Sequence, residues 1–211
     1  SKVRKPHQLV AARLERGQRI SIREAITYLD FHDSTDQLTD ARIETVMNRI
    51  SPVIGEIQPL RTAPLTAPIA YRRLTYWESK NNLGSLVGIA WPPGSSAHIH
   101  THANDCWSKT IEGELHVTNF ASVDENRLQK GGVDILLPGS LSEMKQSDTL
   151  HALTNPGDKP AIHLHYYGPS IETAGIRYEP ESGVQWEELD EGAVFEVDAR
   201  DDILPSIRFE G

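Results

Sequence analysis

The sequence of 211 residues has little cysteine, few aromatic residues and a shortage of positive charge. The single cysteine, Cys106, excludes an intramolecular disulfide framework and fits a reducing compartment. With 21 basic against 30 acidic residues, the net charge of −9 argues against non-specific nucleic-acid binding. No run of eighteen apolar residues and no secretory pattern occurs. We therefore expect a cytoplasmic protein that binds neither membrane nor nucleic acid, as a monomer or homodimer.

The first third of the chain predicts helices. Ser21-Ile22-Arg23-Glu24 is a capping-box pattern, and Thr39 is an expected N-cap for a second helix with apolar residues at helical spacing from Ile43 to Ile50. An earlier helix is expected around 9–14. The prolines between 52 and 68 predict a connection without a long helix.

From Ala70 onwards, short strand-like stretches alternate with Gly, Pro, Asn and Asp. The expected strands are 71–77, 83–91, 108–111, 114–120, 133–137, 151–155, 161–167, 175–178, 184–189 and 193–197. This pattern predicts a mainly β protein with an antiparallel sandwich or barrel. We expect residues 1–69 to form a helical layer packed on a β-barrel of residues 70–211, within one structural domain.

Histidines provide the most informative motif. His98-Ile99-His100 follows a Pro-Pro-Gly turn, and His151 comes about fifty residues later. On an extended segment, His98 and His100 would point to the same face, because side chains alternate with a period of two. A third imidazole from His151 would complete a three-nitrogen face with open positions, which suits a redox metal.

These motifs resemble those of a known superfamily. Gly94 to His100 followed by Gly113-Glu114-Leu115, and Leu136 to Ser140 followed by His151 to Asn155, resemble the two motifs of the cupins, which are antiparallel jelly-roll barrels. Within cupins, the segment from His151 to Pro169, with its His163-Leu-His165-Tyr-Tyr167 run, resembles the cysteine dioxygenase-type thiol dioxygenases. The resemblance covers about 71–177.

This resemblance implies Fe(II) held by His98, His100 and His151 without a protein carboxylate. It also implies oxidation of cysteine or a related small thiol by O2 to a sulfinic acid. The thiolate of the substrate would supply the negative charge that a carboxylate ligand otherwise provides.

Asp105 and Cys106, which both precede Gly113, can each be interpreted in two ways. Asp105 occupies the position of the usual cupin glutamate when counted from His100, and would be a fourth ligand if it points inward. Counting back from Gly113 instead gives Cys106 the family's cysteine position, with one residue inserted after the histidine pair. Cys106 is then either cross-linked to Tyr167 through a thioether, as in some relatives, or a buried free thiol.

Catalytic assistance is expected from Tyr167, with His165 holding its hydroxyl group. His163 stands where the family commonly has serine, so the relay or the pocket differs here. The substrate carboxylate requires a cation, and the candidates are Arg72, Arg73 and Arg177. His102 shares its parity with His100, but we expect it at the rim of the site, because the strand is expected to end near Thr101.

Three other functions stay open at this stage. The chain is alternatively an iron enzyme that carries cysteine beyond the sulfinate in specialised metabolism, or a 3-mercaptopropionate-type dioxygenase. A non-oxygenase cupin, either an isomerase or a small-molecule binding protein, is the alternative from a different class.

Overall fold

The computed structural model describes residues 3–63, 65–66, 71–102, 104–144, 150–168, 175–202 and 207–208. Its helices are α1 (Pro6–Glu15), α2 (Ile22–Ser34), α3 (Asp40–Arg49), α4 (Ile54–Thr62) and the 3-10 helix η1 (Trp186–Glu188). Its first strands are β1 (Leu65–Thr66), β2 (Tyr71–Glu78), β3 (Ser85–Trp91), β4 (Ile99–His100), β5 (Asp105–Glu112) and β6 (Leu115–Asp124). The others are β7 (Arg127–Leu136), β8 (Leu141–Met144), β9 (Leu150–Thr154), β10 (Ala161–Gly168), β11 (Gly175–Pro180), β12 (Val194–Asp202) and β13 (Ile207–Arg208).

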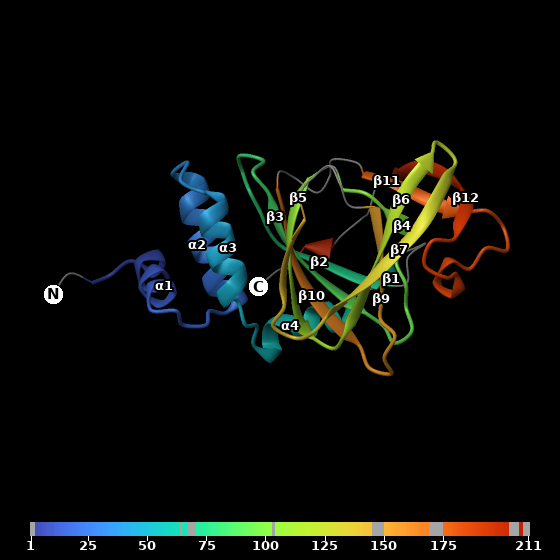
Figure 1. Ribbon diagram of the computed structural model, residues 1–211. Coiled ribbons are helices and arrows are strands. Elements are labelled where there is room, and N and C mark those ends of the chain that lie inside the picture. The colour runs from blue at the N-terminus through green and yellow to red at the C-terminus, as the bar shows by residue number, and fades with distance from the viewer. Residues whose placement is uncertain are drawn as a thin grey trace.

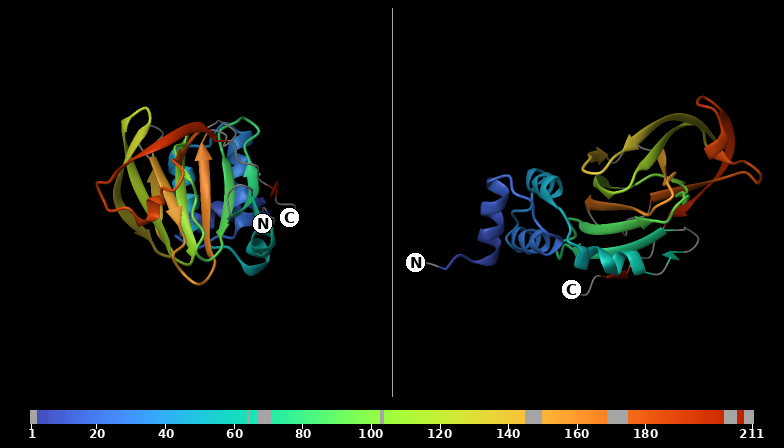
Figure 2. Two further views of the ribbon diagram at one scale, coloured as in Figure 1. Left: turned by 90° about the vertical axis from the view of Figure 1, so that its right-hand side faces the viewer. Right: turned by 90° about the horizontal axis from the view of Figure 1, so that it is seen from below.

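The expected mainly β fold with an N-terminal helical layer is confirmed. One sheet has the order β1-β2-β3-β10-β5-β8, with β13 beside β2, and strands β11-β12-β7-β6-β9-β4 form a closed barrel. Helices α1, α2 and α3 form a block at one end of the molecule, and β11, β12 and η1 lie at the other (Figure 1). A second view shows the same succession from the helical block through the first sheet to the second (Figure 2).

Strand β10 separates two interiors. Its even-numbered residues Ile162, Leu164 and Tyr166 join the core that includes the buried faces of the helices. Its odd-numbered residues His163, His165 and Tyr167 are also buried, and Tyr167 belongs to the core between the two sheets. This alternation is the ordinary consequence of a pleated strand that is covered on both faces.

Hydrogen bonds fasten the helical block to the sheet. The buried carboxylate of Asp33, near the end of α2, accepts hydrogen bonds from Ser79 Oγ (2.6 Å) and the Lys80 amide (2.9 Å) in the β2–β3 turn. Lys109 Nζ of β5 donates to the carbonyl oxygen of Asn48 (2.6 Å) at the end of α3. The two ends of this interface are therefore fixed by polar contacts as well as by apolar packing.

One short helix was not foreseen, and one expected strand was wrong. Helix α4 forms despite Pro59, because the Glu56 carboxylate accepts a hydrogen bond from the N-cap amide of Val53 (3.0 Å) and Ile57 and Leu60 are buried against the sheet. Residues 184–189 form η1 and turns in place of a strand. The amides of Val184 and Leu189 bond to carbonyl groups three residues back, and Trp186 packs edge-on against Phe120. Pro64 and Pro68, from which the connection was also predicted, lie outside the described residues.

None of the helices in the described part of the chain is long and apolar enough to cross a lipid bilayer.

Glu56 provides a test of how the helical block is held. Its carboxylate is 1% exposed and accepts hydrogen bonds from the amides of Ile22 (3.0 Å), Arg23 (2.9 Å) and Val53 (3.0 Å). It therefore caps α2 and α4 together. We expect Glu56→Ala to lower the free energy of unfolding by about 2–4 kcal/mol, because buried amide donors lose their acceptor.

Urea unfolding followed by circular dichroism measures this effect. Glu44→Ala, an exposed position on α3, is the matched control and is expected to change stability by less than about 0.5 kcal/mol. Equal effects of the two substitutions would contradict the capping role of Glu56.

Candidate metal centre

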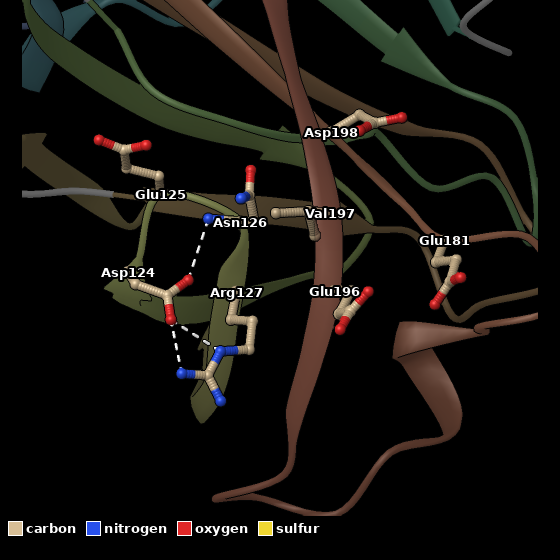
Figure 3. A pocket seen from close by; sticks show the side chains of 8 residues that line it. All are labelled: Asp124, Glu125, Asn126, Arg127, Glu181, Glu196, Val197 and Asp198. Atoms are coloured by element: carbon tan, nitrogen blue, oxygen red, sulfur yellow. Dashed lines mark hydrogen bonds and ion pairs between the residues drawn. The ribbon is translucent and has the colours of Figure 1, made fainter.

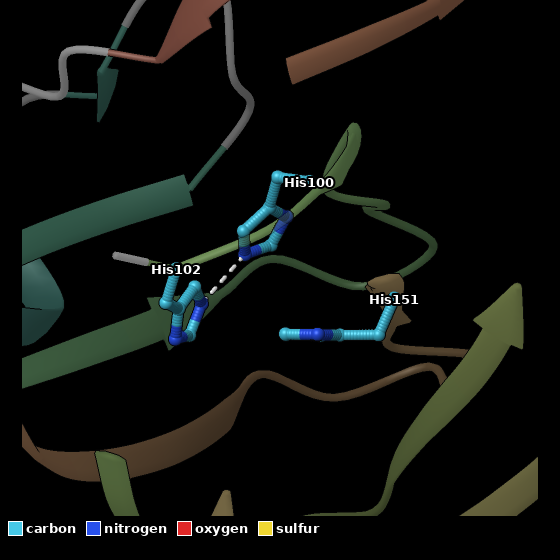
Figure 4. Close-up of side chains that lie close together, drawn as sticks. All are labelled: His100, His102 and His151. Carbon is cyan, nitrogen blue, oxygen red and sulfur yellow. Dashed lines mark hydrogen bonds between the residues drawn. The ribbon is translucent and has the colours of Figure 1, made fainter. Parts of the chain in front are cut away.

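Three histidines converge inside the barrel from two adjacent strands and the loop that follows one of them. His100 is on β4, His151 is on β9 directly opposite it, and His102 comes two residues after β4 ends. Their possible ligand atoms all lie within 4.8 Å of one another. The three rings point toward a common space in Figure 4, with ring centroids 4.6 Å apart for His100 and His151 and 4.9 Å apart for His102 and His151.

The trio predicted from the sequence differs in one member, because His98 lies outside this group. Ser96 pairs with Thr154 and His100 pairs with His151. The four steps along the chain from Ser96 to His100 therefore correspond to only three steps from Thr154 back to His151. The extra residue acts as a β-bulge and shifts the side-chain alternation, so the simple alternation that joined His98 to His100 does not hold. The His98 ring is 5.4 Å from that of His100, and His98 lines a different cavity with Arg177.

His102 takes the inner position because extended pairing continues beyond β4. The Thr101 amide donates to the carbonyl oxygen of Ile176 (2.9 Å), and the Ile176 amide donates to Thr101 Oγ1 (3.1 Å). The pleat therefore persists for two more residues, and His102 remains in phase with His100. The equal spacing of His100 and His102 along the strand could have placed both in the cluster. His102 was instead expected at the rim, because the strand was expected to end near Thr101.

The donor set fits a metal ion. His100 Nδ1 is 2.9 Å from the carbonyl oxygen of His98, which can only accept, so this nitrogen carries the proton and Nε2 presents a lone pair. Nε2 of His100 and Nε2 of His102 are 3.0 Å apart. Two nitrogens bound to one ion at about 2.1 Å and at right angles have about this separation. Burial, with His100 and His151 nearby, holds the pKa of His102 well below its usual value, so its ring is neutral as ligation requires.

Tyr167 and His165 of β10 lie beside this group. The Tyr167 ring meets the His102 ring at 5.5 Å and stacks on the His165 ring at 5.2 Å, nearly parallel. Both side chains are buried. A phenolic hydroxyl and an imidazole therefore stand at one side of the histidine cluster. Among the described residues, the cluster consists of the three histidines, and Asp105 is not part of it.

Cys106 is joined to the histidines of β10. It is directly opposite Tyr167 across the β5–β10 pair, which places the two side chains on one face. Its Sγ is 3.3 Å from His165 Nδ1, and His165 Nε2 is 2.9 Å from His163 Nδ1. Burial raises the pKa of the Cys106 thiol, with Asp105 adding to the effect, so the sulfur is protonated near neutral pH.

The three candidate arginines occupy different surroundings. Arg73 is 1% exposed, shares the inner parity of β2 and lies near enough to His102 and His165 to influence their pKa values. Arg72 points to the other side of β2, where its guanidinium donates to the carbonyl oxygen of Ala63. Arg177 is directly opposite His100 across the β4–β11 pair, and it is paired with Glu179 (2.9 Å) in the cavity that His98 lines. Of the three arginines, Arg73 is the one that is almost fully buried and that contributes to the lowered pKa of His102.

Two other cavities differ in chemistry. One of about 290 Å³ adjoins the cluster and is lined in part by His151, His163 and His165. A larger cavity of about 750 Å³ surrounds the β6–β7 turn and is lined by acidic side chains, with Arg127 paired to Asp124 (Figure 3). The second lies on a different part of the barrel, and the histidines do not line it.

Solved structures that match part of the chain include an oxalate oxidase in complex with the substrate analogue glycolate (18% identity, 53% of this chain and 58% of that chain, TM-score 0.42). A cupin-superfamily sugar phosphate isomerase from Silicibacter pomeroyi has 19% identity over 46% of this chain and 55% of that chain, with a TM-score of 0.35. A double-stranded β-helix protein from Klebsiella pneumoniae has 21% identity over 57% of this chain and 90% of that chain, with a TM-score of 0.40. This chain thus aligns with little more than half of the oxalate oxidase.

A family match is more specific. Residues 74–179, half of the chain, match the cysteine dioxygenase type I family. The matched stretch contains the three converging histidines and Tyr167, and it begins one residue after Arg73. On this match, the chain belongs to the cysteine dioxygenase type I family.

Proposed function

We propose that this protein is a mononuclear non-haem iron dioxygenase that oxidises a small thiol to its sulfinate. The observation that carries the proposal is the convergence of His100, His102 and His151, with Tyr167 against His102, in a chain of the cysteine dioxygenase type I family. His100, His102 and His151 are the proposed ligands of Fe(II), so His102 replaces His98 in the expected set.

The metal, when bound, supplies the redox chemistry by which both atoms of O2 add to the thiol sulfur, so that RSH and O2 give RSO2H with no other reactant. The protein provides the surroundings for this step. Leu115, Leu153 and Trp91 belong to the apolar core around the site and limit the entry of water.

Positioning is assigned to three polar side chains. Arg73 binds the carboxylate of the substrate, because a buried guanidinium offers paired donors that match a carboxylate. The Tyr167 hydroxyl is the hydrogen-bond donor beside the reacting atoms. His165 holds Tyr167 through the stacked contact of their rings.

The function itself is tested by oxygen consumption of the Fe(II)-loaded protein with cysteine, 3-mercaptopropionate and cysteamine offered separately. We expect uptake with at least one thiol and a product that is heavier by two oxygen atoms. Metal-free protein is the control and is expected to consume no oxygen. A product of another mass would favour the diverted chemistry, and no uptake by iron-loaded protein with any thiol would overturn the proposal.

The ligand set makes a second prediction. We expect His102→Ala to lose bound iron, with a decrease in iron affinity of at least about 10-fold, because one of three nitrogen donors is removed. His98→Ala is the matched variant and is expected to retain iron. Iron content after dialysis against a weak chelator measures both. Loss of iron from the His98 variant alone would restore the set that the sequence suggested.

The arginines make a third prediction. We expect Arg73→Gln to raise KM for cysteine relative to cysteamine, which lacks the carboxylate, by about 10- to 100-fold, since a charge-assisted hydrogen bond is worth about 1.5–3 kcal/mol. Arg72→Gln is expected to leave this ratio unchanged. Because both substrates are tested on the same protein, a loss of stability affects both alike. An unchanged ratio in the Arg73 variant would show that the carboxylate is bound elsewhere.

A further inference from the structure

The cavity of about 290 Å³ beside the histidine cluster lies between the two sheets. Side chains of β5, β8 and β10 line one wall, and side chains of β6, β7 and β9 line the other. His151 belongs both to the cluster and to this lining, so a ligand held at the proposed metal centre has the cavity beside it. Pockets that hold a whole small molecule start at about 300 Å³, so the cavity suits one part of such a ligand.

Val117 and Leu153 form an apolar pair next to His151. They are directly opposite each other across the β6–β9 pair, and the next pair on the same face consists of Asn119 and His151. Alternate residues of a strand are about 7 Å apart, so a short chain that starts at the cluster reaches this apolar pair. Leu136 of β7 extends the same apolar surface.

The opposite sheet supplies a further apolar side chain, that of Met144. Met144 is directly opposite Cys106 across the β5–β8 pair, and Cys106 is directly opposite Tyr167 across the β5–β10 pair. This row therefore leads from the tyrosine beside the cluster to the cavity. Val117, Leu136 and Met144 pack on the core between the sheets but are only partly buried, so apolar surface is left uncovered where they line the cavity.

The polar side chains of the lining offer little to a charged group. Ser108 Oγ and Ser142 Oγ are 3.4 Å apart and bond to each other, and Asn119 Nδ2 donates to Asp134 (2.8 Å). No lysine or arginine is among the described residues that line the cavity, so an anion finds no partner there. Asp134 and Glu143 are exposed, so water screens their attraction for a cation.

One polar atom of the lining departs from this pattern. His163 Nε2 is buried without a hydrogen-bond partner among the described residues. It is a donor or an acceptor according to which of the two nitrogens of the ring carries the proton, and in either state it offers one hydrogen bond. A charged group would lose its hydration for this single bond, which is unfavourable. The cavity therefore favours an uncharged and mainly apolar group.

We propose that this cavity receives an apolar substituent on the sulfur-bearing carbon of the substrate, with Val117, Leu136 and Leu153 as the side chains that select it. The inference rests on the proposed thiol dioxygenase and adds that its substrate is a thiol larger than cysteine. Arg73 binds the carboxylate of this thiol, and the substituent covers the apolar surface between the sheets. Each methylene that is buried in this way favours binding by about 4-fold.

The test compares three thiols that differ at one position. 3-Mercaptopropionate, 3-mercaptohexanoate and mercaptosuccinate carry hydrogen, propyl and carboxylate, respectively, on the sulfur-bearing carbon. Their Kd values are measured anaerobically by calorimetry on the Fe(II)-loaded protein, so that no oxidation is needed. We expect the propyl compound to bind about 10- to 60-fold more tightly than 3-mercaptopropionate, because three carbons are buried. Mercaptosuccinate is expected to bind no more tightly than 3-mercaptopropionate, because its second carboxylate would be desolvated without a cation.

A substitution in the apolar pair locates the effect. Val117→Phe is expected to lower the preference for the propyl compound by at least about 10-fold, because the larger ring occupies the space that the propyl group needs. Val133→Phe is the matched control and is expected to leave the preference unchanged. Val133 is exposed on β7 and points away from the cavity, since its neighbour Asp134 lines it. A wild-type preference below about 3-fold, or one that persists in Val117→Phe, would overturn the cavity assignment.

A second measurement avoids the substitutions. In wild-type protein loaded with diamagnetic Zn(II), the methyl carbon-13 resonances of Val117 and Leu153 are expected to shift more with 3-mercaptohexanoate than with 3-mercaptopropionate, while those of Val133 stay in place. Equal shifts with the two thiols would also overturn the cavity assignment.

The two proposals fail in different ways. Oxygen uptake with a thiol, together with no preference for the propyl compound, would reject the cavity assignment and keep the dioxygenase. A propyl preference that Val117→Phe removes, without oxygen uptake by the iron-loaded protein with any thiol, would reject the dioxygenase and keep the cavity.

Discussion

The structure depends on one strand that is covered on both faces. The even-numbered side chains of β10 pack against the core shared with the helices, and the odd-numbered ones, His163, His165 and Tyr167, are buried between the two sheets. A slip of one residue in the pairing of β10 would place imidazoles in the helical core and apolar side chains in the site. The pairing with β3 on one side and β5 on the other prevents such a slip. The helical layer therefore contributes to the site without touching it, because the apolar core it completes fixes the orientation of β10.

The bulge before β4 has the opposite effect, since it breaks an alternation. Regular pairing from Ser96 onwards would have kept His98 and His100 on one face. The additional residue takes His98 out of phase with His100, while the extended pairing of Thr101 with Ile176 keeps His102 in phase with His100 and beside His151. Bulges commonly redirect side chains next to functional sites, and here one decides which two of three alternate histidines belong to the cluster.

These two features show how far the sequence alone reaches. The His163, His165 and Tyr167 row was predictable, because a strand of eight residues keeps its period, and so were the capped helices that begin after Ser21 and Thr39. The choice between His98 and His102 was not, because a bulge leaves no mark in a single sequence. Helix α4 was missed for a related reason. Pro59 argues against it locally, whereas the burial of Ile57 and Leu60 that supports it arises from packing against the sheet and is not visible in the local sequence.

Charge is distributed unevenly around the histidine cluster, and this restricts what the site can bind. Arg73 is a buried cation on β2, whereas the cavity of about 290 Å³ beside the cluster is lined by two carboxylates, those of Asp134 and Glu143. A ligand with an acidic and a basic group would meet an opposite charge at each of its two ends. A ligand with only one of these groups would be attracted by only one of the two charged regions. Reversing such a ligand in the site would bring like charges together on both sides, which is costly in a poorly solvated interior. The uneven charge therefore favours one orientation of any small ligand that carries both an acidic and a basic group.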